Sequence, residues 1–189
     1  MTEPLRLPDP PLRGPRIVLR AWTDGDLPAV AEAATDPYIP LITTVPAEYT
    51  DAEGRAWVAR QAGRLADREG WPFAIADAAS GEAMGLIGLW LRGHGVGELG
   101  YWLAGSARGR GMAAEAVRVV TRWALAEAGF GRVQLTAEPW NVASIRTAER
   151  AGFVREGLLR SSAVYGGTRR DLIMFSRLPS DPEPAASIH

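Results

Sequence analysis

The sequence predicts one α/β domain built around a mixed sheet, and three observations lead to this fold class. The chain has 189 residues, of which 47% are hydrophobic and 23% are charged, as in a protein with a single globular core. Its apolar segments alternate between strand-like and helix-like periods, with strands before, between and after the helices. Turn-forming residues separate these segments, and the sequence contains no internal repeat or interior linker.

The domain is predicted to span residues 16–178, between two tails. Residues 1–15 are rich in proline, and we expect them to form an N-terminal arm that contributes little to the core. Residues 179–189 are polar and rich in turn-forming residues, so we expect this C-terminal tail to be disordered.

The first half of the domain is predicted to fold as a strand, two helices and a three-stranded meander. The segment "RIVLRAW" alternates as a strand does, and "DGDLPAVAEAA" starts with acidic capping residues and continues as a helix. A loop over 35–50 leads to a second helix over 51–69. Short turns then separate three strands that we expect to pair antiparallel, over 71–77, 83–92 and 95–104.

The second half begins with a long helix that opens at the glycine-rich "SARGRGM" and runs to about Ala128. Its apolar residues recur at helical spacing, at Ala113, Val117, Val120 and Ala124, and Gly129 is expected to stop it. The remaining elements are a strand over 132–138, a helix over 141–152 and strands over 153–160 and 169–178.

The composition excludes several kinds of catalytic site. The sequence has no cysteine, so thiolate nucleophiles, cysteine zinc sites and disulfides are absent. With only His94 and His189 to supply imidazole, we expect neither a bound metal nor a Ser-His-Asp triad. All 21 basic residues are arginine, and without lysine the chain has neither a Walker-type phosphate loop nor Schiff-base chemistry.

The charge and hydropathy patterns predict a cytoplasmic protein. A net charge of −1 gives no basic field for nucleic acid or an anionic membrane surface. The apolar run "MGLIGLWL" is strand-sized, and the first 15 residues are too polar for a signal peptide. We therefore expect a small molecule or another protein as partner, and a monomer or homodimer. The bias toward Ala, Gly, Arg and Pro is typical of a GC-rich genome, and we expect a bacterial source.

The segment "SARGRGMAAEA", residues 106–116, predicts an anion-binding turn. Glycines let the backbone approach a ligand closely, and the first turn of a helix presents unpaired N–H groups and a partial positive charge. Arg108 and Arg110 add guanidinium groups that match phosphate oxygens. The expected ligand is a phosphate, and specifically a pyrophosphate; the alternative is a tight strand-to-helix turn with solvated arginines.

The same residues also satisfy a second motif. "GRGMAA" matches GxGxxA, the fingerprint of Rossmann dinucleotide-binding units, and Glu138 ends the next strand as an acid that could bind ribose. An NAD(P)-dependent oxidoreductase is therefore an alternative. Its motif would normally follow the first strand directly, whereas here it comes in mid-chain after a meander.

Two motifs in this order resemble the GCN5-related N-acetyltransferases (GNAT), in particular the subgroup similar to the RimJ and RimL ribosomal-protein N-terminal acetyltransferases. "YWLAGSARGRGMAAEAV" is similar to the acetyl-CoA-binding motif Arg/Gln-x-x-Gly-x-Gly/Ala, and "EPWNVASIRTAERAGFVREG" to the second motif. The matching residues are Arg108, Gly111 and Ala113, then Asn141, Ser144, Gly152 and Phe153. The resemblance implies a mostly antiparallel mixed sheet of about seven strands with helices on both faces, splayed in the middle to hold acetyl-CoA.

The resemblance also implies how the co-substrate is held. The strand before the glycine turn would carry a bulge and present backbone groups to pantetheine, and the turn itself would bind the pyrophosphate. Asn141 would lie near the pantetheine arm, although it is also a good helix N-cap. The residues expected to bind acetyl-CoA are Trp102, Leu103, Ala104, Arg108, Gly109, Arg110, Gly111, Met112, Ala113, Asn141 and Ser144.

In this family a primary amine attacks the acetyl thioester directly, so the enzyme supplies a base and a proton donor rather than a nucleophile. The resemblance puts the Ser144 hydroxyl near the sulfur of coenzyme A, where it would act as the proton donor; the alternative is a local helix cap. Glu98, the lone carboxylate of its strand, is the expected base, unless it is simply exposed or ion-paired. Glu138 or water is the alternative base, and Asp171 is expected to shape the acceptor side.

The acceptor pocket is expected to lie between the loop over 36–50 and the hairpin over 161–170. Its expected lining residues are Tyr38, Trp57, Glu138 and Tyr165. The resemblance implies an acetyl-CoA-dependent N-acetyltransferase that acts on a protein N-terminal α-amine or a small-molecule amine. A non-catalytic acyl-CoA-binding module is the alternative.

Overall fold

The computed structural model describes residues 3–184 and contains a sheet with the strand order β1-β2-β3-β4-β5-β6-β8-β7. The strands are β1 Leu12–Arg13, β2 Ile17–Arg20, β3 Gly70–Asp77, β4 Ala83–Leu91, β5 Val96–Leu103, β6 Arg132–Ala137, β7 Val154–Tyr165 and β8 Thr168–Arg177. All neighbours pair antiparallel except β5 and β6, which run parallel. The predicted α/β class and the meander are therefore confirmed, and the eighth strand is the two-residue β1.

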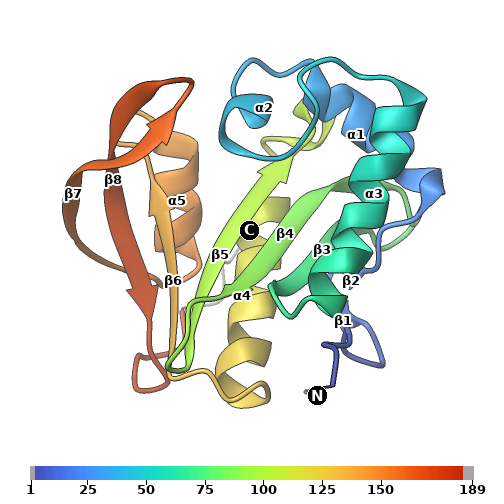
Figure 1. The fold of residues 1–189 in the computed structure, drawn as a ribbon. Helices are drawn as coiled ribbons and strands as arrows, with labels where there is room; N and C mark the ends of the chain where they lie inside the picture. The colour runs from blue at the N-terminus through green and yellow to red at the C-terminus, as the bar shows by residue number, and fades with distance from the viewer. Residues whose placement is uncertain (1–2, 185–189) are drawn as a thin grey trace.

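Helices cover both faces of this sheet (Figure 1). They are α1 Leu27–Ala34, α2 Ile39–Ile42, α3 Asp51–Ala66, α4 Met112–Ala126 and α5 Val142–Arg150, with short 3-10 turns at Asp24–Asp26 and Gly105–Ala107. The first three helices pack on one face, around a cluster that includes Trp22, Trp57 and Trp102. On the other face, α4 buries Val117, Val120 and Ala124 against the strands, as their spacing predicts.

Two elements differ from the prediction: a side chain outside the apolar pattern starts α2, and an irregularity in the backbone lies within β7. The expected loop over 35–50 contains the short helix α2, which begins where the Asp36 carboxylate accepts the N–H groups of Tyr38 and Ile39, at 2.8 and 3.0 Å. Strand β7 continues five residues beyond its predicted end, to Tyr165, through a register shift between Leu159 and Ala163. Helix α4 ends as predicted, with Gly129 at φ +77°.

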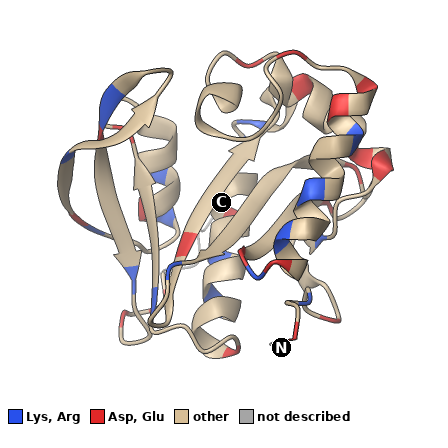
Figure 2. Cartoon of the chain, in the orientation of Figure 1, with Lys and Arg blue, Asp and Glu red and all other residues tan. Residues whose placement is uncertain are grey.

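The two predicted tails contact the domain where they are described. In the arm, Leu7 and Leu12 pack against the main core, and the Trp71 indole donates to the Arg6 carbonyl at 2.9 Å. In the predicted C-terminal tail, residues 179–184 lie beside α4 and β8, and residues 185–189 fall outside the described part of the chain. Arginine and acidic residues are interspersed along the ribbon (Figure 2), in keeping with the net charge of −1.

Candidate active site

A splay between β5 and β6 opens the middle of the sheet. Parallel pairing of these strands runs from Val96 with Arg132 to Leu99 with Leu135 and stops there, although β5 continues to Leu103. The expected splay is thus present. The expected bulge is not: β5 pairs with β4 in unbroken register, so the opening results from β6 turning away toward β8.

A cavity of about 1180 Å³ occupies this opening and extends along the adjoining helices. It is bordered by the end of β5, the start of α4, the first turns of α5 and the α1–α2 loop. Its lining includes most of the predicted site, namely Tyr38, Trp57, Glu98, Trp102, Leu103, Arg108, Gly109, Gly111, Met112, Ala113, Glu138, Asn141, Ser144 and Tyr165. Arg110 and Ala104 are not among the lining residues, and the arginine side chain instead reaches the Met84 sulfur at 3.8 Å.

The glycine turn presents the expected cradle of backbone donors. Gly109 and Gly111 have φ of +79° and +75°, a left-handed conformation that favours glycine, and Gly111 is the N-cap of α4. Within residues 3–184, the N–H groups of Gly109 and of residues 111–114 donate to no protein acceptor. The first turn of α4 therefore points free N–H groups and the positive helix end toward an incoming anion.

The back of this cradle is fixed by an ion pair that the sequence did not reveal. The buried Glu115 carboxylate accepts both the backbone N–H and the guanidinium Nε of Arg16, at 2.8 and 3.0 Å. Arg16 also donates to the carbonyl of Arg110 at 2.8 Å. The bond to Arg110 holds the peptide between the two cradle glycines, and the ion pair neutralises Glu115 at the helix start.

The Arg108 side chain turns toward the α1–α2 loop. Its Nη2 lies 2.7 Å from the Asp36 carboxylate, and its Nε donates to the Leu103 carbonyl at 3.1 Å. Burial alone would raise the pKa of Asp36, but hydrogen bonds from the Tyr38 N–H and from Arg108 lower it below 3.8. Arg108 thus ties the cradle to the loop. The Ala104 N–H donates to Met84, so two of the backbone groups predicted to face pantetheine already have protein partners.

Ser144 forms a hydrogen-bonded pair with a residue that the sequence analysis missed. Its hydroxyl oxygen lies 2.7 Å from the phenolic oxygen of Tyr101, and its backbone N–H donates to the Asn141 side chain at 3.1 Å. Asn141 is therefore the predicted N-cap, while the Ser144 hydroxyl serves another group. Burial raises the pKa of Tyr101 above 10.0, and its bonds with Ser144 and Thr147 offset only part of that rise. Tyr101 stays protonated at neutral pH.

The two predicted carboxylates lie at opposite ends of the opening. Glu98 is at the paired end, where Arg92 donates to both of its oxygens at 3.1 and 3.2 Å and Gln134 donates at 3.3 Å. It is therefore ion-paired, as the alternative interpretation predicted. Glu138 follows the last residue of β6 at the open end, is 4% exposed, and accepts the Tyr38 hydroxyl at 2.6 Å.

Aromatic rings lie near Glu138, on the expected acceptor side. Tyr38 packs edge-on against Trp140, with ring centroids 4.8 Å apart, and burial together with Glu138 raises the Tyr38 pKa above 10.0. Trp57 is only 1% exposed and packs edge-on against Trp22 at 4.7 Å, so it belongs to the core beneath the cavity. The Asp171 carboxylate accepts the Ser161 N–H at 2.8 Å within the β7–β8 hairpin, and Asp171 is not among the lining residues of the cavity.

Comparison with known proteins identifies the family. The family model described as "Acetyltransferase (GNAT) domain" matches residues 16–154. Over 140 residues the chain is 30% identical to the Bacillus subtilis protein named Probable N-acetyltransferase YjcK, covering 72% of this chain and 77% of that protein. The chain belongs to the GNAT acetyltransferase family. GNAT proteins are acetyl-CoA-using N-acetyltransferases, and the predicted family and enzyme class are confirmed.

Solved structures share the GNAT fold. Mycobacterium smegmatis RimJ in complex with a CoA-disulfide has a TM-score of 0.76 and 22% identity, over 89% of this chain and 86% of that one. RimL, a ribosomal L7/L12 α-N-protein acetyltransferase in complex with coenzyme A, has a TM-score of 0.72 and 18% identity, over 87% and 95%.

The GNAT assignment removes the Rossmann alternative. A doubly wound dinucleotide-binding sheet is mostly parallel, whereas β5 and β6 form the one parallel pair among the described strands. In the described part of the chain, no cluster of three or more His, Asp or Glu side chains is placed to hold a metal ion. None of the helices described there is long and apolar enough to span a membrane.

Proposed function

We propose that this GNAT protein transfers an acetyl group to a primary amine that approaches from the side of α1 and α2, and that coenzyme A lies in the splay between β5 and β6. The observation that carries this proposal is a single cavity that is lined both by Ser144 and by Gly109 and residues 111–114, whose N–H groups are free within residues 3–184. The N–H groups suit a pyrophosphate, and the unpaired edge of β5 beyond Leu99 suits the amides of pantetheine.

In the proposed reaction the neutral amine attacks the thioester carbon, the carbon–sulfur bond breaks and the sulfur leaves with the electron pair, while the attacking nitrogen loses its second proton to solvent as the amide forms. The Ser144 hydroxyl gives a proton to that sulfur. Tyr101, which stays protonated because burial raises its pKa, in turn donates to the Ser144 oxygen. The two hydroxyls thus form a short proton relay at the start of α5, and solvent returns the proton that the relay gives to sulfur.

Glu138 is the proposed base. Its carboxylate borders the open end of the cavity, beside Tyr38, and the Nε of Arg170 is 3.7 Å away and makes no hydrogen bond within residues 3–184. The oxygens of Glu98, in contrast, are engaged by Arg92 and Gln134. Glu138 can therefore accept the proton that the ammonium group loses before attack.

The proposed acceptor is the α-amine of a protein or peptide, because RimL, a ribosomal L7/L12 α-N-protein acetyltransferase, shares the fold. Labelled acetyl-CoA should be offered with peptides that have free or blocked N-termini and with small primary amines. We expect transfer to free N-termini and none to the blocked controls. Transfer to small amines alone would replace the peptide assignment, and binding of acetyl-CoA without any transfer would favour the non-catalytic module.

A further inference from the structure

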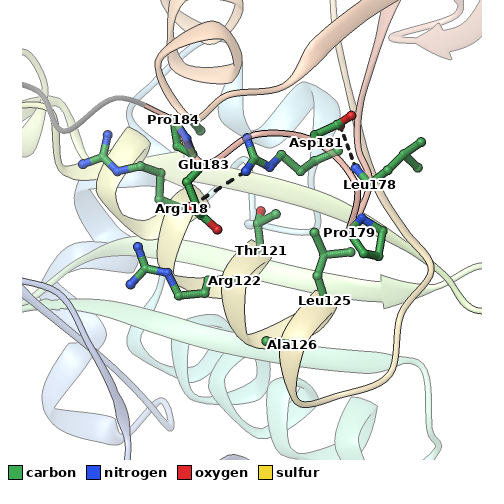
Figure 3. A pocket seen from close by; sticks show the side chains of 12 residues that line it. Arg118, Thr121, Arg122, Leu125, Ala126, Leu178, Pro179, Asp181, Glu183 and Pro184 are labelled. Atoms are coloured by element: carbon green, nitrogen blue, oxygen red, sulfur yellow. Dashed lines mark hydrogen bonds and ion pairs between the residues drawn. The ribbon is translucent and has the colours of Figure 1, made fainter.

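A second cavity lies against the other side of α4 and shares no lining residue with the acetyltransferase cavity. It has a volume of about 160 Å³, is partly open to solvent, and is lined by one stripe of α4, the end of β8 and residues 178–184 (Figure 3). The stripe consists of Arg118, Thr121, Arg122 and Leu125, which are spaced so that they share one helix face. No group in the proposed reaction uses this cavity.

The Thr121 hydroxyl is buried without a partner. The residue is 3% exposed, and within residues 3–184 its oxygen has no hydrogen-bond partner. A threonine inside a helix commonly donates to the carbonyl one turn earlier, but here the oxygen is directed into the cavity (Figure 3). Because a buried hydroxyl without a partner destabilises a protein, this orientation indicates a missing acceptor.

Arg177 is a buried cation whose charge is poorly compensated. Its side chain is 6% exposed, and it donates to the Gly152 carbonyl at 3.1 Å. The carboxylate it faces, Glu183, is 3.8 Å away on a side chain that is 73% exposed. A guanidinium has five N–H donors, and a buried one normally has close anionic partners.

Two further arginines add positive charge to the same cavity. Among the described residues, Arg118 and Arg122 form neither an ion pair nor a hydrogen bond with a protein group. The second carboxylate of the lining, Asp181, accepts the Leu178 N–H at 2.9 Å and is thereby held at the rim. Arg177 and the Thr121 hydroxyl thus face a small space whose lining also holds two arginines, Arg118 and Arg122, and two carboxylates, Asp181 and the loosely placed Glu183.

We propose that this cavity binds a small oxyanion of the phosphate class. The volume is several times the roughly 30 Å³ occupied by a water molecule and well below the ~300 Å³ of sites that hold drug-sized ligands, so it suits a phosphate group rather than a nucleotide. Guanidinium forks match phosphate oxygens in pairs, and the Thr121 hydroxyl supplies one more donor. A dianion also outcompetes the distant Glu183 carboxylate for Arg177.

Calorimetric titration of inorganic phosphate into the full-length protein tests this site. Saturating coenzyme A is kept present so that phosphate does not occupy the start of α4. The titration is then repeated without coenzyme A in the Gly111→Glu protein. The result for the second cavity therefore stands even if the proposed function fails. We expect saturable binding near one equivalent that weakens as ionic strength rises. Acetate at equal ionic strength is expected to bind far more weakly, since it carries one charge and two oxygens.

Variants assign the binding to the cavity. Thr121→Val keeps the side-chain shape and removes the hydroxyl, and Arg122→Gln removes a charge from an exposed side chain, so both are expected to fold. Each should weaken phosphate binding by about tenfold, the loss expected for one charge-assisted hydrogen bond. The matched control Arg160→Gln, on an exposed arginine of β7, should leave it unchanged. Absence of saturable binding would overturn the proposal, and so would a phosphate affinity in all three variants equal to that of the wild type.

Discussion

The hydroxyl of Ser144 lies 2.7 Å from the hydroxyl of Tyr101, and these two residues come from the two sides of the splay. Ser144 is in the first turn of α5, which follows β6, and Tyr101 is near the end of β5. Each residue therefore positions the other across the opening. Variants at these two positions can therefore distinguish a chemical role for Ser144 from a purely structural one.

Ser144→Ala is expected to lower kcat and leave the KM for acetyl-CoA nearly unchanged. General acid assistance is commonly worth about 10²- to 10⁴-fold, and a thiolate is a good leaving group, so we expect the low end. Steady-state kinetics at saturating acceptor measures this. A structural role would instead lower the melting temperature and leave kcat intact, and Tyr101→Phe should reproduce part of the kcat loss only if the relay operates.

Gly111→Glu is expected to abolish acetyl-CoA binding. The new side chain would occupy a left-handed position beside the cradle, close to Arg16, and would add a negative charge where pyrophosphate is expected. Calorimetry with acetyl-CoA measures the loss. Gly63→Glu, on an α3 position with open space around it, adds the same charge elsewhere and should bind normally; unchanged binding by both variants would place the co-substrate elsewhere.

Arg108→Gln and Arg110→Gln are expected to differ. Arg110 has no carboxylate partner among the described residues, so its loss should raise only the KM for acetyl-CoA, by about two- to fivefold and less at high salt. Arg108 holds Asp36 of the α1–α2 loop, so its loss should raise the KM for the acceptor as well. Initial rates with each substrate varied in turn separate the two effects, and identical profiles would contradict the tie between cradle and loop.

Glu138→Gln is expected to lower kcat strongly and to remove the acidic limb of the pH profile of kcat. The carboxylate can no longer accept the amine proton, whereas its shape and the bond from Tyr38 are largely kept. Glu98→Gln is the matched comparison and should mainly lower the melting temperature, because it breaks the ion pair with Arg92. An acidic limb that survives in Glu138→Gln and disappears in Glu98→Gln would reverse the assignment.

Glu156→Gln is expected to destabilise the protein in a pH-dependent way. Hydrogen bonds from Arg132 and Ser176 lower the pKa of Glu156 from 4.5 to about 2. Because the folded pKa is depressed, this carboxylate stabilises the fold above about pH 4.5, and the contribution is lost as the pH falls toward about 2. Melting temperatures of wild type and variant should differ at pH 7 and converge in acid, while exposed Glu48→Gln should show no such trend.

Local patterns predicted most of the fold. The face of α4 and the meander follow from apolar spacing and turn residues that lie within a few positions of each other. Helix α2 was not predicted, because its start depends on one carboxylate, that of Asp36, rather than on apolar residues at helical spacing. Strand β7 was cut short because a residue with φ of +52°, Ser161, interrupts its alternation.

The site was less predictable where it depends on distant partners. The glycine cradle and the N-cap Asn141 are local features, and both are where the motifs place them. Tyr101 and Ser144 are 43 positions apart, and Arg16 and Glu115 are 99 apart. Such pairs are created by the packing of strands and helices, and nothing in their local sequence distinguishes them from other polar residues.

The two halves of the sheet are joined at the two ends of the splay in different ways, by backbone pairing at one end and by a side-chain hydrogen bond at the other. The backbone pairing consists of four residue pairs between β5 and β6, from Val96–Arg132 to Leu99–Leu135. At the open end, Tyr38 from the first half reaches Glu138 in the second. An amine that takes the place of the Tyr38 hydroxyl at Glu138 would break this side-chain contact by rotating Tyr38, while the backbone pairing of β5 with β6 stays in place.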